Sequence, residues 1–201
     1  MRVLLVLVLV CGAMESWGCR SLARLEMAHE AEFEGADGED AFTLEPDEQG
    51  VDLELAEGGD LAGYRLVSGK LRVKHRNGTI HFVAPRGEKL ALTDADGRVL
   101  QLLGKQPDGD LTFEDGDGNR LYKAKVRDDG YKLEDSSEQE VARVKVREDK
   151  ISIKDASGET ILSTKDPFPP TAAACLALPH LAVEVRAGLA LGVMAYGWDN
   201  P

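Results

Sequence analysis

Residues 111–130 read LTFEDGDGNRLYKAKVRDDG, and residues 131–150 read YKLEDSSEQEVARVKVREDK. Both stretches have the same rhythm: an alternating apolar and polar run, a short polar turn, a second alternating run and another turn. Alternation with a period of two is typical of a β-strand that has one buried and one solvated face. Each stretch of about twenty residues therefore predicts one β-hairpin.

This hairpin pattern recurs along the chain in rows that begin at Leu71, Leu90, Leu111, Tyr131 and Ile151, with spacings of 19, 21, 20 and 20 residues. The fifth position of a row is His75, Asp94, Asp115, Asp135 or Asp155. The eighth position is Gly78, Gly97, Gly118, Glu138 or Gly158. Aspartate at the start of a turn and glycine at its end suit a type I turn in which glycine takes the positive φ.

Two further strands are expected near residues 51–55 and 64–67, which makes about twelve antiparallel strands in a meander. Twelve strands are too few for a propeller of four-stranded blades, and an open sheet of this size would leave exposed edges. A closed barrel removes the edges, but a barrel this wide is not filled by its own side chains. The sequence predicts a mainly β domain over residues 50–201 that encloses a separate filling.

The filling is expected from the C-terminal segment, because residues 187–196 contain no charged side chain. A helix that is apolar on all sides is buried in protein or in a membrane. Ten residues are too few to cross a bilayer, and polar residues such as Glu184 and Arg186 interrupt any longer window. We expect a helix at about residues 171–197 that threads the barrel, with small residues easing its fit. Anchoring of this segment in a membrane is the alternative.

The N-terminus carries an export signal over residues 1–18, in which a basic start precedes a short apolar run. Gly18 and Cys19, just after this run, resemble the cleavage box of bacterial lipoproteins. The resemblance implies that Cys19 becomes the first residue of the mature chain and carries a lipid. Ser16 and Trp17 depart from the usual residues of this box, and a signal cleaved without lipidation is the alternative.

The net charge of −12 arises in one segment, because residues 26–60 contain fourteen acids and no Lys or Arg. Such a stretch is expected to remain solvated, so residues 19–49 are predicted to form an acidic flexible tether. A role of this segment in buffering cations or binding a partner is the alternative. The acidity and the absence of a basic block argue against nucleic acid as a partner.

The strand number, the turn rhythm and the final helix together resemble the tubby-like superfamily, which includes LURP-one-related and phospholipid-scramblase-like domains. That family has a twelve-stranded barrel around an apolar C-terminal helix, and the resemblance would cover residues 50–197. Some of its members bind phosphoinositides or move lipids. None of their binding residues can be matched to positions of this chain.

The sequence offers few candidates for metal ligands or catalytic residues. Residues 115–119 resemble the start of an EF-hand loop, but Arg120 and Val126 stand where that loop needs Gly and Glu, so a turn is favoured and weak Ca²⁺ binding stays open. A two-residue turn after residue 76 would place His75 and His81 on opposite faces, where they cannot share a metal. Cys175 is expected in the core. We expect no catalytic residues, no cofactor and no metal.

The sequence thus favours an exported lipoprotein of the bacterial cell envelope, facing the periplasm or the cell surface, that acts as a non-enzymatic binding or scaffold module. Its expected partners are the membrane, through the lipid on Cys19, and a phospholipid or another envelope protein. A lipid-interacting module is the alternative, and an enzyme that uses the loops of the barrel rim is a third. Four basic residues that could touch an anionic lipid or glycan alternate on one strand: Lys70, Arg72, Lys74 and Arg76.

Overall fold

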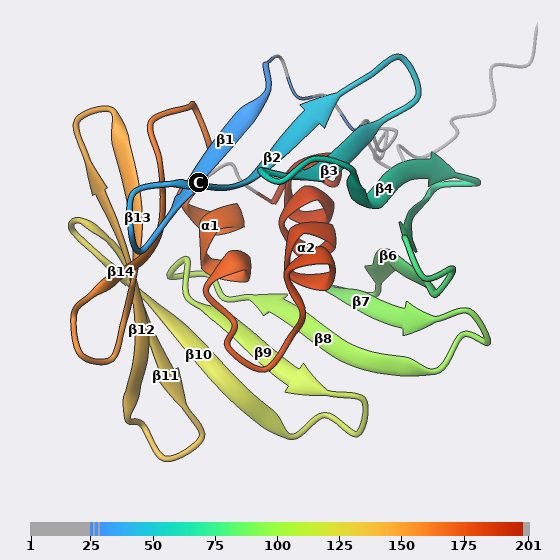
Figure 1. Cartoon of the computed structure of the whole chain (residues 1–201). Helices are drawn as coiled ribbons and strands as arrows, with labels where there is room; N and C mark the ends of the chain where they lie inside the picture. Colours follow the sequence, from blue (N-terminus) through green and yellow to red (C-terminus); the bar gives the residue numbers. More distant parts are fainter. Residues whose placement is uncertain (1–24, 26, 28, 199–201) are drawn as a thin grey trace, which may run out of the picture.

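A computed structural model describes residues 25, 27 and 29–198. Fourteen strands precede two helices in this part of the chain (Figure 1). The strands are β1 (Ala31–Gly35), β2 (Asp40–Pro46), β3 (Val51–Leu55), β4 (Asp60–Val67), β5 (Lys70–His75), β6 (Ile80–Arg86), β7 (Lys89–Asp94), β8 (Val99–Lys105), β9 (Leu111–Asp115), β10 (Arg120–Arg127), β11 (Gly130–Asp135), β12 (Glu140–Arg147), β13 (Lys150–Asp155) and β14 (Thr160–Thr164). The helices are α1 (Pro170–Leu176) and α2 (Val183–Ala195).

The strands form one closed barrel, because each strand pairs antiparallel with the next and β1 pairs with β14. The closing seam is short and matches Glu34 with Ser163 and Gly35 with Leu162. The Asp166 carboxylate reinforces the seam by accepting a hydrogen bond from the Glu32 N–H at 2.8 Å. The prediction of a closed, mainly β barrel is confirmed.

The barrel begins earlier in the chain than the sequence analysis predicted. Residues 31–46, which were expected to belong to the flexible tether, form β1 and β2 and raise the strand number from about twelve to fourteen. Phe33 and Phe42 on these strands point into the barrel, where their rings stack with centroids 4.7 Å apart. Burial of these apolar side chains outweighs the solvation of the acids that alternate with them.

Seven turns of the same kind lie at one end of the barrel, which we call the turn mouth; they join β1 to β2, β3 to β4 and so on to β13 and β14. The turn after β9 is representative. The Asp115 N–H donates to the Asn119 carbonyl at 2.9 Å, and the Asp115 carboxylate accepts from the N–H groups of Asp117 and Asn119 at 2.9 Å each. Gly118 has φ +89°, as the type I turn predicted from the sequence requires.

Six of these seven hairpins contain a register shift of the β-bulge type just after the turn. The exception is the hairpin of β5 and β6, in which Val73 pairs with His81 and Lys74 with Ile80 without a shift. The row that contains this hairpin is 19 residues long, whereas the other rows have 20 or 21 residues. The row is shorter because it lacks the extra residue that a bulge inserts.

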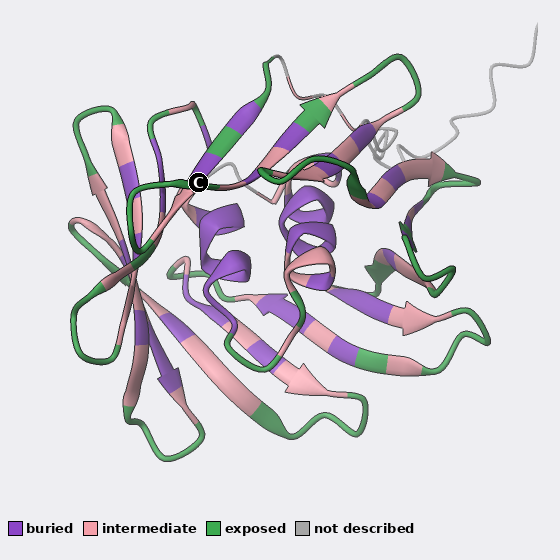
Figure 2. Cartoon of the chain, in the orientation of Figure 1, coloured by how far each residue is buried: buried purple, intermediate pink, exposed green. Residues whose placement is uncertain are grey.

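Both helices lie inside the ring of strands, and their side chains form the centre of the core (Figures 1 and 2). α2 packs on β4–β7, and α1 packs on β11–β13. The fit of α2 is close: a Cβ on Gly188 would lie 2.7 Å from Val73 Cγ2, and a Cβ on Gly192 would lie 2.6 Å from Val83 Cγ1. The prediction that the apolar C-terminal segment fills the barrel is confirmed. It forms two helices, separated by residues 177–182, in place of the single helix that was expected.

Tyrosine hydroxyls attach the helices to the barrel wall. The Tyr64 hydroxyl donates to the Glu184 carbonyl at 2.9 Å, and the Tyr196 hydroxyl lies 2.9 Å from the Gly69 carbonyl oxygen. The Tyr131 hydroxyl lies 3.2 Å from Thr171 Oγ1 in α1. Cys175 is fully buried in α1, and this burial raises the pKa of its thiol far above the ordinary value, as suits a core residue.

Candidate functional site

Strands β3, β4 and β5 form a charged outer face next to the turn mouth. Cross-strand pairing sets Arg72 opposite Arg65 on β4, and sets Lys74 opposite Gly63 on the same strand. Because Gly63 has no side chain, the wall is hollowed between Asp52 on one side and Lys74 on the other. The hollow has a volume of about 460 Å³, and we call it the basic groove. Its polar lining consists of Asp52, Asp60, Arg65, Arg72, Lys74, His75 and Arg76.

Arg65 is the one cation of the groove whose charge is neutralised. Its guanidinium lies 2.7 Å from an oxygen of Asp47 and 2.9 Å from an oxygen of Asp52, and it donates to the Val51 carbonyl at 2.7 Å. The hydrogen bond with Asp52 is the main cause that raises the pKa of Arg65. Asp52 lies over the floor of the groove, with its Oδ1 3.0 Å from the place where a Cβ on Gly63 would stand.

The other three cations, Arg72, Lys74 and Arg76, form no ion pair with any residue that the structure describes. The buried Nε of Arg72 also has no hydrogen-bond partner among the described residues. An unpaired buried donor carries a desolvation cost. This arrangement is unfavourable for stability by itself and favours binding of an anion.

Several outward cations elsewhere on the barrel are paired with carboxylates of the same strand or of the neighbouring strand. Lys125 lies 2.6 Å from Glu134, and Lys132 lies 3.1 Å from the same carboxylate. Arg143 forms a two-pronged contact with Glu140, at 3.0 and 2.9 Å. The groove differs in that three cations without such a partner among the described residues line one hollow.

His75, at the inner side of the groove, belongs to a polar cluster that the sequence analysis placed wrongly. His75 and His81 were expected on opposite faces, but His75 Nε2 lies 2.8 Å from His81 Nδ1. The turn between them has three residues, 76–78, in place of the two that were assumed, and this shifts the register by one. Glu184 at the start of α2 approaches His75 Nδ1 to 3.7 Å.

The histidine pair is partly shielded from water. Burial lowers the pKa of His81, and the neighbouring His75 lowers it further, while Asp94 and Glu184 act in the opposite direction. A neutral pair shares one proton along the Nε2–Nδ1 line, with one ring as donor and the other as acceptor. The pair thereby connects the wall behind the groove to the first turn of α2.

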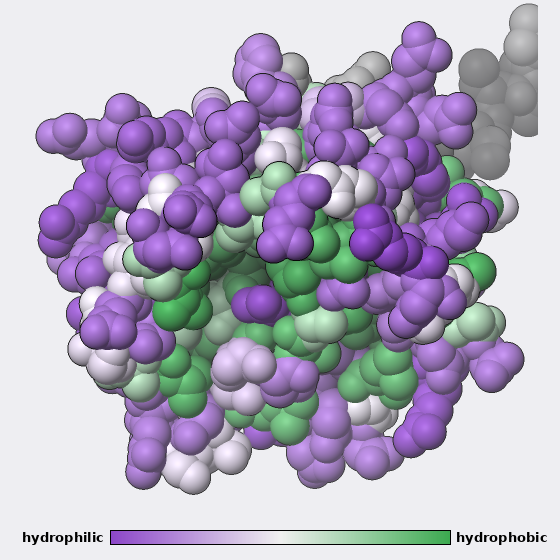
Figure 3. Space-filling model, in the orientation of Figure 1, coloured by the Kyte–Doolittle hydropathy of each residue, from purple (hydrophilic) through white to green (hydrophobic). Residues whose placement is uncertain are grey.

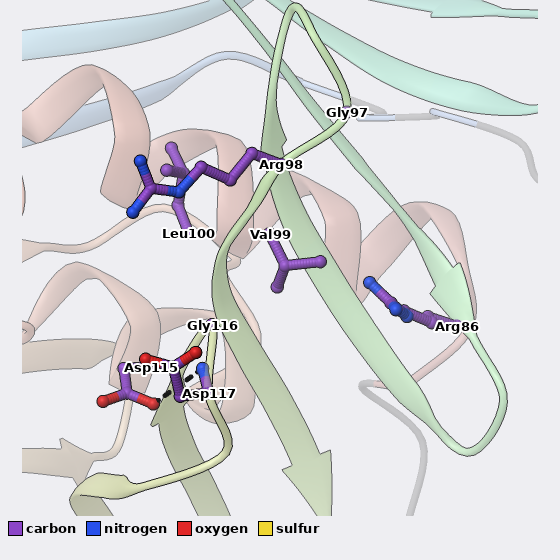
Figure 4. Close-up of a pocket in the computed structure, with 8 residues that line it drawn as sticks. All are labelled: Arg86, Gly97, Arg98, Val99, Leu100, Asp115, Gly116 and Asp117. Atoms are coloured by element: carbon purple, nitrogen blue, oxygen red, sulfur yellow. Dashed lines mark hydrogen bonds between the residues drawn. The ribbon is translucent and has the colours of Figure 1, made fainter.

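A second hollow, of about 520 Å³, lies between the turns that follow β7 and β9 (Figure 4). Figure 4 shows Arg98 and Arg86 on opposite sides of Val99, so these two cations do not converge on one point. Asp115 in this hollow is engaged by its own turn: the Asn119 amide is the first cause that lowers its pKa. This holds residues 115–119 in the predicted turn, and the hollow offers less for binding than the basic groove.

The end of the barrel seen in Figure 3 shows hydrophobic side chains around a central hollow, with hydrophilic residues at the rim. Among the described residues, no three His, Cys, Asp or Glu side chains come together as metal ligands could. Within that same part of the chain, neither helix has the length and apolar character that crossing a bilayer requires. Cys19 and the predicted signal over residues 1–18 lie outside the described residues.

The groove could be predicted only in part. The alternating Lys70, Arg72, Lys74 and Arg76 were visible in the sequence, but the contributions of Arg65 and Gly63 were not. A glycine inside a strand was the available signal for a close approach or a hollow. No family model, no curated protein and no solved structure matches this chain.

Proposed function

We propose that this chain is a non-enzymatic binding module of the bacterial cell envelope, held at the membrane by a lipid on Cys19. Its ligand is an anionic group, which the basic groove receives on the outside of the barrel. The barrel interior is filled by α1 and α2, which leaves the outer surface and the rim for binding. The observation that carries the proposal is a set of three cations around a hollow that form no ion pair within the described part of a chain whose net charge is −12.

The proposed lipid anchor on Cys19 is tested by metabolic labelling with an acyl chain in a bacterial host that processes lipoproteins. The wild-type chain is expected to take up label and to fractionate with membranes, and Cys19→Ala is expected to lose the label. Cys11→Ala serves as the control, because residue 11 lies in the segment that export removes. Label that persists in Cys19→Ala would refute the anchor.

Anion binding is tested with the purified full chain and inorganic phosphate, by calorimetry at two salt concentrations. Binding that weakens with salt and falls about tenfold in Arg72→Gln is expected, because a charge-assisted hydrogen bond contributes roughly 1.5–3 kcal/mol. Arg120→Gln is the matched control, since Arg120 is exposed and lies outside the groove. An equal loss in both variants would mean that binding is a diffuse effect of charge.

A lipid-interacting module is the second candidate, supported by the same groove and by the resemblance to the tubby-like barrels. It requires the groove to accept the phosphate of a lipid headgroup. Salt-sensitive binding of the Cys19→Ala chain to vesicles that contain phosphatidylglycerol, above its binding to pure phosphatidylcholine, is the expected result. Loss of this difference in Lys74→Gln would assign it to the groove.

A further inference from the structure

The basic groove has a second, acidic wall. Asp52 and Asp60 line it from β3 and β4, opposite the cations of β5. Glu45 is the first cause that raises the pKa of Glu54, and Asp60 adds to it; Asp60 also adds to the raised pKa of Arg65, which is due first to Asp52. Arg65 is bound by Asp47 and Asp52, and Asp60 forms no ion pair with a residue that the structure describes. The acidic wall therefore has more negative charge than its one guanidinium neutralises.

The groove thus presents Lys74 and Arg72 on the β5 side of Gly63 and Asp52 on the β3 side, while Arg76 and Asp60 lie near each other at the turn mouth. We infer that its ligand is a small zwitterion, in which an oxyanion of the phosphate type stands a few bonds from a primary ammonium, as in phosphoethanolamine. The inference rests on the proposed binding function and names the class of ligand. The oxyanion would be held by Arg72, Lys74 and Arg76, and the ammonium by Asp60 and the free lone pairs of Asp52.

A simple anion satisfies half of this arrangement. It gains from the three cations but meets the carboxylates of the opposite wall, which favour the approach of a positive charge. A simple cation has the reverse difficulty. A ligand with both charges is attracted by both walls, and complementary charge of this kind gives specificity more than raw affinity.

The test compares four probes against the purified full chain in a neutral detergent by calorimetry: phosphoethanolamine, glycerophosphoethanolamine, inorganic phosphate and ethanolamine. Phosphoethanolamine is expected to bind up to about fivefold more tightly than phosphate, since an exposed ion pair contributes up to about 1 kcal/mol. Ethanolamine alone is expected to show no binding. The diester probe distinguishes the source: tighter binding of glycerophosphoethanolamine indicates a lipid headgroup, and tighter binding of phosphoethanolamine indicates a soluble metabolite.

Single substitutions test the contributions of the two walls of the groove separately. Asp60→Asn is expected to bring phosphoethanolamine down to the affinity of phosphate without weakening phosphate, while Arg72→Gln weakens both by about tenfold. Gly63→Val fills the floor of the groove and is expected to abolish both, although valine suits a strand. Asp96→Asn is the control, because Asp96 is an exposed turn residue outside the groove.

The outcomes separate this inference from the proposed function. If phosphate and phosphoethanolamine bind with equal affinity and both lose binding in Arg72→Gln, the ligand is not a zwitterion and the groove is a simple anion site. A preference that survives in Asp60→Asn would also overturn the zwitterion. Absence of binding by every probe would overturn the inference and the groove as the binding site together, while acyl labelling of Cys19 would still report on the anchor independently.

Discussion

Glu138 has a backbone conformation that is unfavourable for a residue with a side chain. It occupies the turn position that is glycine in the neighbouring repeats, and its φ is +64°, against +89° at Gly118 and +90° at Gly158. A residue with a Cβ loses about 1–2 kcal/mol in this left-handed region, while glycine carries an entropic cost of roughly 0.5–1 kcal/mol. Glu138→Gly is therefore expected to stabilise the protein by about 1 kcal/mol, which corresponds to a rise in Tm of about 2–4 °C.

Thermal unfolding followed by circular dichroism measures this effect. Gly118→Glu is the matched control, because it makes the reverse exchange in the same kind of turn, where nothing lies within 4 Å of an added Cβ. It is expected to lower Tm by a similar amount. A lower Tm for Glu138→Gly would show that the side chain of Glu138 stabilises its turn by an unrecognised contact.

Helix α2 depends on the absence of a side chain at Gly192. A Cβ there would lie 2.6 Å from Val83 Cγ1 in the barrel wall, closer than packed carbons approach. Alanine favours a helix by about 1 kcal/mol over glycine, but overpacking a core costs roughly 1–3 kcal/mol. Gly192→Ala is expected to destabilise the wild-type protein by about 1 kcal/mol or more.

A double-mutant cycle in urea denaturation tests this explanation. In a Val83→Ala background the clash is removed, and Gly192→Ala is expected to become neutral or stabilising, by up to about 1 kcal/mol. If Gly192→Ala costs the same in both backgrounds, close contact with Val83 is not the reason for the glycine.

Among the elements, the hairpin of β5 and β6 is expected to make the folding stability depend on pH. The pKa of His81 is lowered by burial and by His75, so the folded protein binds this proton less readily than the unfolded chain. Its contribution to stability is complete above the unfolded pKa of about 6.5 and is lost as pH falls through the lower folded value. Glu184 on α2 and Asp94 on β7 act against this loss without reversing the direction.

Tm is therefore expected to fall between pH 7 and pH 5, above the range in which the carboxylates titrate. His81→Gln should flatten this fall, and a remaining slope is expected from His180, whose pKa is also lowered by burial. His29→Gln is the control, since His29 is exposed and precedes the first strand. An unchanged slope in His81→Gln would show that the histidine pair does not govern acid stability.

At the scale of the whole molecule, the barrel and its filling stabilise each other. Leu189 and Leu191 are completely buried on α2, inside a ring too wide for its own side chains to fill. A chain that ends after Pro169 is expected to lose cooperative unfolding and to bind a hydrophobic dye. Leu189→Ala is expected to cost about 2–5 kcal/mol, whereas Leu100→Ala, at a side chain 38% exposed, should change stability by about 0.5 kcal/mol or less.

Calorimetry of the truncated chain and of the Leu189→Ala and Leu100→Ala variants shows whether the barrel needs its filling or is stable without it. A truncated chain that stays soluble and melts as sharply as the full chain would disprove the dependence on the helices. The Leu189 and Leu100 pair keeps the test informative if the truncated chain cannot be produced, because both variants remove the same atoms from different surroundings.

Most of the hairpins, most of their turns and the need for a filling could be predicted from the order of the residues alone. These features depend on neighbouring residues, such as the alternation around Phe113 and the hydrogen bonds that Asp115 makes within its own turn. The rows at Ala31 and Val51 continue the same period, but their fifth residues, Gly35 and Leu55, lack the aspartate that made the other rows recognisable. The acidity of that segment concealed β1 and β2.

Features that depend on strand register came only from the folded barrel. A turn of three residues in place of two brings His75 and His81 together, because a shift of one residue moves a side chain to the other face of a strand. The basic groove exists because Gly63 pairs with Lys74 in the hairpin of β4 and β5 and with Asp52 in the hairpin of β3 and β4. Side-chain periodicity can be read along one strand, whereas the meeting of charges from neighbouring strands is set by the register of each hairpin.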